Sequence, residues 1–461
     1  MTHLWRPRLP TVYPVLLGLL ALTSPALQAQ TPSDALAASS PASSAQTAAL
    51  NLPAPLQTGP LALPADIAQA REIWRQANER VAEFPRGHRD LLRWEAANLP
   101  GPSPEGEASP ARALGLDEAL RLSLRHRPEL YTRAGMNALE QAQVRRAFAV
   151  HVRELQHAWI DAVALRQSTR HLGAILEATR TGSELSRRMA RAGNASQAAL
   201  MREQLLEAEA WTAAANAEAR ARAGVERLAR LLGQWDTRAV DALAQRLPAS
   251  LPALPAQVVA GSGAVTTDIE AAVLRSHPAL DMERIAAERA FSGLSAERWQ
   301  AWRDAVDIAL QGMPPLGADA MRPPHLDDLS LLRDHALERA TQQQARLLEL
   351  AAQRRSMARE AWAQLQTRHA LAQHSERVVV NLQTALEQES LLRYNGMLES
   401  SWQLLGSARE RLGALEAAAR ARRDFWRAQA DWQALLAGAD YSGADFSTSG
   451  IGASGTTRGG H

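Results

Sequence analysis

Histidine and aspartate are the residue types in this chain that could hold a metal ion. Two histidines on one helix share a face when they lie four residues apart. The closest histidine pairs in the helix-rich parts are six and five residues apart: His151 with His157, and His369 with His374. The adjacent acids Asp327 and Asp328 precede an apolar run and fit the start of a helix, where negative charge is favourable. The spacing therefore predicts no metal site.

The chain also lacks the residue patterns of an enzyme. It contains no cysteine, which excludes disulfides, thiolate metal sites and cysteine nucleophiles. It has no glycine-rich nucleotide loop, no nucleophile elbow and no convergent acid and base pair. We therefore predict no catalytic activity and no cofactor.

The charges are mixed and nearly balanced. The sequence has 51 basic and 49 acidic residues, a net charge of +2, and every basic residue other than histidine is arginine. Such mixing is typical of solvated helix faces, whereas nucleic-acid binding needs a basic cluster combined with stacking aromatics. We expect no nucleic-acid partner.

Composition and proline placement indicate long helices. Hydrophobic residues make up 46% of the 461 residues and aromatic residues only 5%, in a background rich in Ala, Leu, Arg and Glu. No proline occurs in residues 129–247 or 325–461, and an interior proline costs a helix about 3 kcal/mol. The predicted fold is all-α, with tandem long antiparallel helical hairpins in a coiled-coil-like bundle and little or no β-strand.

Residues 326–393 carry a seven-residue apolar repeat, which predicts a helix about 100 Å long that packs along one seam. The seam comprises Ala351, Ala358, Leu365, Ala372, Val379 and Leu386. Six tryptophans fall within the predicted long helices, where we expect core or interhelical contacts with the indole N–H at the edge. They are Trp159, Trp211, Trp362, Trp402, Trp426 and Trp432.

Two short turns interrupt these helices and look like copies of one another. Each follows an arginine-rich run and precedes a Leu/Ala-rich run that ends in another glycine, Gly233 or Gly438. We expect Gly193 and Gly396 to end their helices with positive φ, and Ser196 and Glu399 to cap the helices that follow. The candidate partner-docking residues in the turns are Arg191, Gly193, Asn194, Arg393, Asn395 and Gly396.

The N-terminus has the pattern of a signal peptide, with basic residues, an apolar run and a small-residue region that ends at Ala29. We therefore expect the mature protein to be exported. The predicted organisation is a signal peptide (1–29), a disordered linker (30–64), a small helical element (65–99), a linker (100–113), a first helical-hairpin repeat (114–235), a linker (236–267), a second repeat (268–438) and a disordered tail (439–461).

Several motifs carry a resemblance to a known family. Leu114-Gly115-Leu116-Asp117-Glu118-Ala119-Leu120, continuing to Arg127-Pro128-Glu129-Leu130, resembles the opening signature of TolC-like outer-membrane efflux proteins. The two turns resemble the paired periplasmic helix-turn-helix repeats of that family. The resemblance implies a homo-oligomer, a trimer, that works with a periplasmic adaptor and an inner-membrane pump. It also implies a location in the periplasm or outer membrane of a Gram-negative cell.

The chain departs from this family where membrane strands should lie. Two strands and a turn need about 20 residues of alternating character, and neither half of the chain offers such a stretch. We therefore expect a divergent member in which the β-barrel strands are reduced or absent.

Two functions remain open from the sequence. In the first, the protein is the helical duct subunit of a tripartite exporter of toxic solutes, metal ions among them. In the second, it is a soluble periplasmic scaffold or adaptor-binding protein, derived from such channels, that has lost the pore.

Overall fold

The computed structural model describes residues 50–56, 66–82, 113–258, 269–313 and 323–441. Within these ranges all regular secondary structure is helical, which confirms the predicted all-α fold. None of the helices in these ranges combines the length and the apolar character that crossing a membrane requires. The predicted signal peptide, most of the first linker, the end of the 65–99 element and nearly all of the tail lie outside the described residues.

The first half of the chain forms one long hairpin. Helix α5 (Ala138–Arg191) has 54 residues, about 80 Å, and α6 (Gln197–Leu231) runs back along it. A capping box starts α5, in which Asn137 and Glu140 exchange hydrogen bonds with each other's backbone N–H. Shorter elements cover the open end of this hairpin: α4 (Leu116–Leu124), the 3₁₀ turn η2 (Pro128–Leu130) and α7 (Thr237–Arg246).

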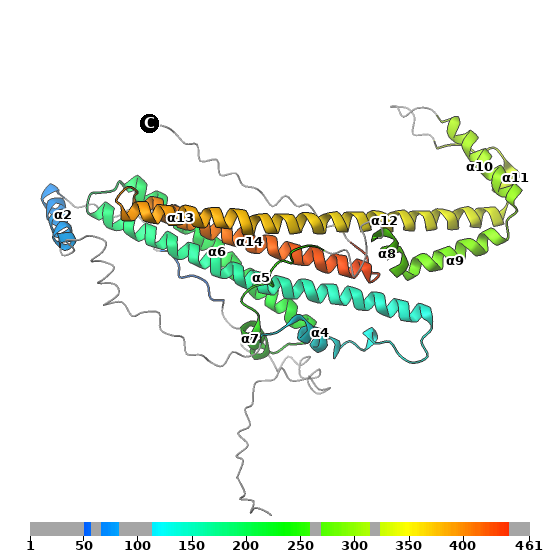
Figure 1. The fold of residues 1–461 in the computed structure, drawn as a ribbon, viewed down its shortest axis with the longest axis horizontal. Helices are drawn as coiled ribbons and strands as arrows, with labels where there is room; N and C mark the ends of the chain where they lie inside the picture. The colour runs from blue at the N-terminus through cyan, green and yellow to red at the C-terminus, as the bar shows by residue number, and fades with distance from the viewer. Residues whose placement is uncertain (1–49, 57–65, 83–112, 259–268, 314–322, 442–461) are drawn as a thin grey trace, which may run out of the picture.

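The second half forms another long hairpin. Its outgoing arm is continuous through α12 (His335–His374), the π-helical turn η4 (Ser375–Val379) and α13 (Val380–Asn395), and its returning arm is α14 (Ser401–Leu436). The other described helices of this half are α8 (Ile269–Ser276), α9 (Pro278–Ser292), α10 (Ala296–Gln311) and α11 (Leu329–Leu332). An isolated helix, α2 (Ile67–Ala82), lies beyond the turns of both hairpins (Figure 1).

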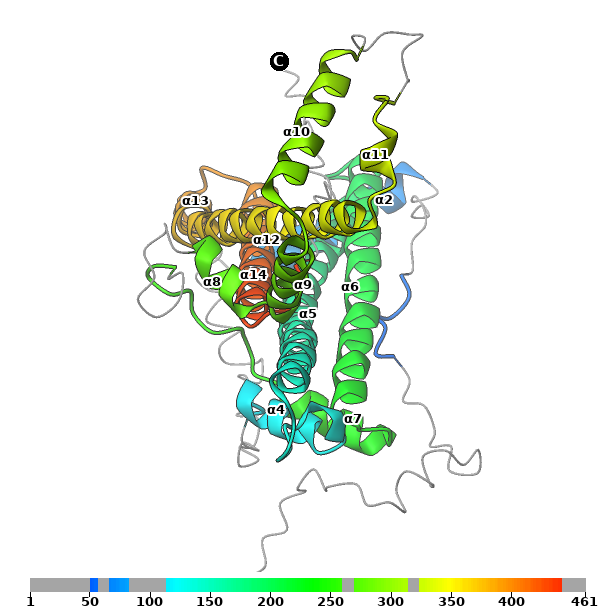
Figure 2. The same cartoon turned by 90° about the vertical axis from the view of Figure 1, so that its right-hand side faces the viewer.

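The four long arms lie side by side in the order α6, α5, α14 and α12–α13, because α5 packs against both α6 and α14, and α14 packs against α12 and α13. Figure 2 shows α6 and α13 on opposite flanks, with α5 and α14 between them. The two hairpins therefore meet mainly through their inner helices. One side of each outer arm is left without a neighbouring long helix in the described chain.

Each hairpin has its own core. In the first, Leu155 and Val163 of α5 pack with Leu228 of α6 and with Leu243 of α7. In the second, apolar side chains of α12 and α14 pack with α8 in a cluster that includes Val273, Trp362, Leu365, Phe425 and Trp432.

The tryptophans take the predicted positions. Trp159, Trp362 and Trp432 are buried, and the other three are half-buried between elements. Indole N–H groups at the edges donate to backbone carbonyls, as from Trp159 to Leu114 at 3.0 Å and from Trp426 to Pro252 at 3.1 Å. Trp211 donates to the carbonyls of Pro53 and Ala54, so residues 50–56 lie against α6 although the sequence places them in a linker.

On the outgoing arm, residues of the predicted seam are buried only before the π turn. Ala358, Leu365 and Ala372 are buried, whereas Leu386 is 54% exposed, and its position in the seam was predicted wrongly. A π turn contains more residues than an α turn, so the residues after it are rotated about the helix axis. As a result Glu387 faces α14 and pairs with Arg411, while the leucines of α13 point away from α14.

A charged cluster joins the end of α14 to both hairpins. Asp440 pairs with Arg354 of α12 and with Arg146 of α5, and Arg153 of α5 donates to the Asp440 carbonyl. Gly438 has a φ of +93° and approaches so closely that a Cβ atom there would lie 2.7 Å from the Ser276 carbonyl. Residues 439–441, which the sequence assigns to the tail, are therefore packed into the structure.

His277 is buried beside this cluster. Its Nε2 lies 3.9 Å from Asp440, and neither ring nitrogen has a hydrogen-bond partner among the described residues. Burial, followed by the charges of Arg354 and Arg146, lowers the pKa of His277 from 6.5 to about 4. The neutral ring is therefore the form that the folded protein accepts at neutral pH.

We predict a pH-dependent stability that depends on His277. Between about pH 6.5 and pH 4 the unfolded chain binds a proton at this residue and the folded chain does not, so the free energy of unfolding falls as pH falls, by up to ~1.4 kcal/mol per unit. His277→Gln, which cannot titrate, should show a flatter profile in urea unfolding across this window. Parallel profiles for the two proteins would contradict the assignment.

Candidate docking site at the hairpin turns

The first turn ends α5 in a Schellman motif. The N–H of Asn194 donates to the Met189 carbonyl at 2.8 Å, and that of Gly193 donates to Ala190 at 3.1 Å. Gly193 has a φ of +75°, in the region that glycine adopts without strain. The side chain of Ser196 then accepts from the N–H of Ala199 and caps α6, as predicted.

The second turn has the same hydrogen bonds but a different residue at the left-handed position. Leu398 N–H donates to Arg393 and Met397 N–H donates to Tyr394, and it is Met397 that has a φ of +59°. Gly396 has a φ of −81°, so the prediction of a positive φ at Gly396 was wrong. The cap of α14 is Ser400, in a capping box with Gln403, and not Glu399.

The two turns share one backbone motif when the left-handed residue of the first, Gly193, is matched with that of the second, Met397. Ser196 then matches Ser400, because each cap lies three residues after the left-handed residue. Arg191 matches Asn395 and Asn194 matches Leu398. The similarity of the turns therefore lies in backbone geometry and capping, and the side chains that they present differ.

Both turns lie at the same end of the molecule, away from α9 and α10 (Figure 1). Close to this end, α14 contacts both arms of the first hairpin. Arg409 lies 3.6 Å from Glu203 of α6, and Leu405 Cδ1 would lie 3.7 Å from a Cβ atom placed on Gly182 of α5. The six candidate residues are thus brought to one end of the layer, three in each turn.

The arginines of the turns differ in how far they are paired. Arg191 is exposed and forms no ion pair with the described residues. Arg393 lies 2.8 Å from Glu389 and 3.6 Å from Glu399. The hydrogen bond with Glu389, followed by the charges of both glutamates, raises the pKa of Arg393. Arg191 is therefore the more accessible cation for an acidic partner.

Sequence reasoning missed the most exposed apolar residues at this end. Leu392, Met397 and Leu398, which we call the apolar knob, are 67%, 87% and 80% exposed. Turns seldom present large apolar side chains, because such surface is costly in water unless a partner covers it. A Met-Leu pair between a turn glycine and a capping serine is the signal that could have revealed the knob.

The outer arms also carry uncovered apolar side chains near the turns. On α6, Met201 and Leu205 are 49% and 64% exposed. On α13, Leu382 and Leu386 are 61% and 54% exposed, because of the rotation at the π turn. We call these two surfaces the α6 edge and the α13 edge.

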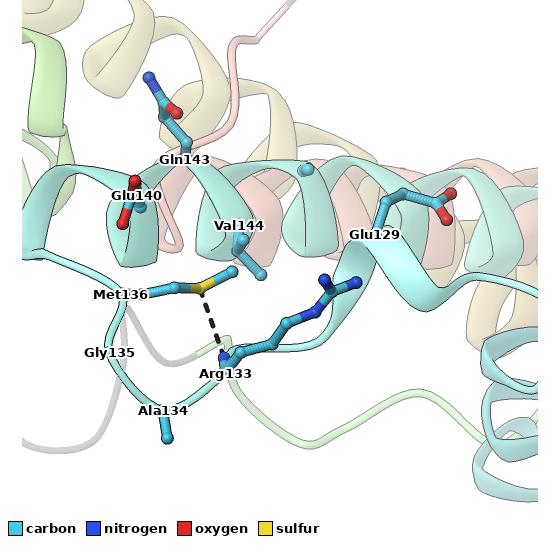
Figure 3. Close-up of a pocket in the computed structure, with 9 residues that line it drawn as sticks. Glu129, Arg133, Ala134, Gly135, Met136, Glu140, Gln143 and Val144 are labelled. Carbon is cyan, nitrogen blue, oxygen red and sulfur yellow. Dashed lines mark hydrogen bonds between the residues drawn. The ribbon is translucent and has the colours of Figure 1, made fainter.

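A cavity of about 530 Å³ lies at the other end, between residues 129–136 and the first turns of α5 (Figure 3). Figure 3 shows Glu129 and Glu140 on opposite sides of it. Glu140 is committed to the α5 cap, and Arg133 Nη2 donates to the Pro128 carbonyl at 3.4 Å. The lining contains no serine, threonine or histidine that could serve as a nucleophile or base.

Three of the four histidines weighed as metal ligands have protein partners. His151 lies 3.0 Å from the Ser123 hydroxyl, His157 lies 3.0 Å from Asp431, and His369 lies 2.8 Å from the Pro255 carbonyl. Asp328 accepts from the N–H of Ser330 and begins α11, as expected from the sequence. Across the described ranges, no three His, Asp or Glu side chains gather in a geometry suited to a metal ion.

Comparison with known proteins finds similarity in structure alone. No protein-family model matches the chain, and the search of curated proteins finds no match. The outer-membrane channel OprN aligns over 70% of each chain with 17% identity and a TM-score of 0.46. The outer-membrane protein VceC from Vibrio cholerae aligns over 71% of this chain and 76% of its own, with 14% identity and a TM-score of 0.40. The CmeC outer-membrane channel from Campylobacter jejuni aligns over 66% of each chain, with 10% identity and a TM-score of 0.43. The structures found in this comparison are thus those of outer-membrane channels and an outer-membrane protein, each at most 17% identical to this chain.

The turn geometry predicts opposite effects for two substitutions. Met397→Gly should raise the free energy of unfolding by about 1 kcal/mol, because it relieves a left-handed conformation, and Gly193→Ala should lower it by about as much. Gly396→Ala is the matched control and should be nearly neutral, because its Cβ would meet only ordinary contacts at 3.5 Å. Urea unfolding measures all three. A large loss in Gly396→Ala would place the left-handed residue there instead.

Proposed function

We propose that the protein is an exported helical duct subunit in the efflux of solutes, and that copies stand side by side to enclose the path. The observation that carries this proposal is the pair of uncovered edges on a layer one helix thick. The α6 edge and the α13 edge are different surfaces on opposite flanks. Contact between two different surfaces repeats from copy to copy and closes into a ring when the rotation allows.

The exposed leucines of the two edges lie at similar distances from the turns along their helices. Leu205 is nine residues from the cap Ser196, about 14 Å along α6, and Leu386 is eleven residues from Met397, about 16 Å along α13. Met201, the other member of the α6 edge, lies nearer the turn, five residues from Ser196. The two helices run in opposite directions relative to the turn end, so an edge-to-edge contact would form an antiparallel pair with leucines and methionine between the helices.

The turn end would serve as the partner-binding end in this proposal. The apolar knob supplies surface for a partner to cover, and the exposed Arg191 supplies charge beside it. By resemblance, the partners are a periplasmic adaptor and an inner-membrane pump, and the ring is a trimer. The predicted repeats at 114–235 and 268–438 would each contribute one hairpin to the wall, and metal ions remain one class of candidate solute.

A disulfide between the edges tests the ring. The chain contains no cysteine, so Leu205→Cys combined with Leu386→Cys introduces the only two thiols. Under mild oxidation the double variant should form a covalent ladder that ends at a closed oligomer on a denaturing gel. Each single variant should remain monomeric, because its thiol faces a different surface of the neighbour.

A second control moves one thiol away from the edge. Leu205→Cys with Ile308→Cys should give no ladder, since Ile308 lies on α10 at the far end. Disulfide-linked dimers of either single edge variant would show that each edge contacts the same edge of a second copy. A double variant that stays monomeric would show that the α6 edge and the α13 edge do not contact each other. Either outcome would contradict the proposed ring.

Cell fractionation distinguishes the duct function from the alternative function as a soluble scaffold. A duct subunit should appear in detergent-extracted outer membrane as a heat-resistant oligomer, because neighbouring copies and the membrane hold it there. A scaffold that has lost the pore should leave the cell with the osmotic-shock fluid. Immunoblots of both fractions, with a known protein of each compartment as control, distinguish the two. Recovery of monomer in the shock fluid alone would overturn the duct proposal.

A further inference from the structure

Helix α10 is an outlier in this fold. None of its residues is buried, and none of the described helices packs along it. It is fixed at its start, where Trp299 meets Phe291 edge-to-face with ring centroids 5.1 Å apart. The guanidinium of Arg298 also lies 3.1 Å from Asp334, the residue that caps α12. The helix is therefore held in place while most of its length projects from the molecule.

One side of α10 is apolar. Trp299, Trp302, Val306 and Leu310 follow one another at intervals of three, four and four residues, which places them on one stripe. Met313 follows just beyond the end of the helix at Gln311. Leu310 is 52% exposed and Met313 is 42% exposed, whereas Trp299, Trp302 and Val306 are half-buried. This α10 face, as we call it, includes two indoles, which combine a large apolar ring with an N–H donor.

The charges of α10 are sorted around this face. Arg298 and Arg303 come one residue before Trp299 and one residue after Trp302, so they border the stripe on its two sides. The acids Glu297, Asp304 and Asp307 project from the rest of the circumference. Arginine at the border and carboxylates farther away suit a surface that carries phosphate groups.

Helix α10 is also accessible at the end of the molecule opposite the turns. Figure 2 looks at that end and shows α10 projecting to one side of the long arms. In Figure 1, α10 also slopes back toward the turn end, so that it stands away from the bundle. The α6 and α13 edges, by contrast, run along the long arms near the turns, where a neighbouring copy would meet them.

We propose that the α10 face binds a phospholipid surface, with the indoles at the level of the headgroups and Arg303 directed to the phosphates. Tryptophan is enriched at this level in membrane proteins because its ring is apolar and its N–H is polar. That the surface in the cell is the periplasmic leaflet of the outer membrane rests on the proposed function. The lipid binding itself does not depend on that function or on ring formation.

Site-specific labelling of the full chain tests this proposal. The absence of cysteine allows Leu310→Cys and Ile308→Cys each to carry one environment-sensitive fluorophore. Ile308 is the matched control, because it lies on the same helix, is 71% exposed and points away from the α10 face. The probe is a vesicle of phosphatidylethanolamine with a smaller share of phosphatidylglycerol.

Vesicles should shift the emission of the label at position 310 to the blue and lower its accessibility to a water-soluble quencher severalfold. The label at 308 should remain accessible. Leu310→Glu should weaken vesicle co-sedimentation about tenfold or more, the loss expected when a leucine no longer enters an apolar phase, with the circular dichroism spectrum unchanged.

Three results would overturn the proposal. The label at 310 could remain accessible to the quencher when vesicles are present. Both labels could become protected equally, which would place the contact elsewhere on the chain. The label at 310 could become protected without vesicles as protein concentration rises, which would show that a second copy covers the face. These readouts do not involve the α6 and α13 edges. A negative result for lipid binding would therefore leave the outcome of the disulfide test of the ring unaffected.

Discussion

Helices of this length depend on lateral packing. An isolated helix gains little from intrinsic propensity, so each long arm must bury a stripe of apolar side chains against a neighbour. The inner helices α5 and α14 achieve this on two sides, since each packs with its own hairpin partner and with the other hairpin. Across the α5–α14 contact, Arg427 pairs with Asp161 at 2.6 Å and Ser168 donates to Glu416 at 3.0 Å. Directional contacts of this kind fix how the hairpins align, whereas apolar packing alone would tolerate sliding.

In a layer one helix thick, each inner helix has a long helix on both sides, whereas each outer helix is covered on one side only. The π turn increases this effect on α13, because it directs Glu387 toward α14 and the leucines outward. Had the α-helix continued without it, the seven-residue seam would have kept Leu386 against α14. Single π turns are rare within α-helices and are frequently found at functional sites. An edge made apolar by this rotation is consistent with a surface that another helix covers.

The sequence predicted the elements that follow from local chemistry. Long proline-free tracts predicted the long arms, and Gly193 with Ser196 predicted the first turn. Features that depend on tertiary contacts could not be predicted. The π turn has no residue signature, and the left-handed Met397 follows a glycine that would have been the better candidate. Asp440 lies in a stretch whose composition resembles a tail, and only the folded chain places Arg354 and Arg146 around it. Of the candidate site, the turn positions were predictable and the apolar knob was not.

Met397 gives the clearest indication of what the second turn is for. Its backbone conformation costs about 1 kcal/mol relative to glycine, and its side chain is 87% exposed, so the side chain packs little against the described residues. A glycine would serve the fold better, as Gly193 does in the first turn. Strain and exposed apolar surface at one residue are both unfavourable for an isolated chain, and both become understandable if a bound partner covers the side chain. The second turn, more than the first, is therefore the part of this end where partner contact should concentrate.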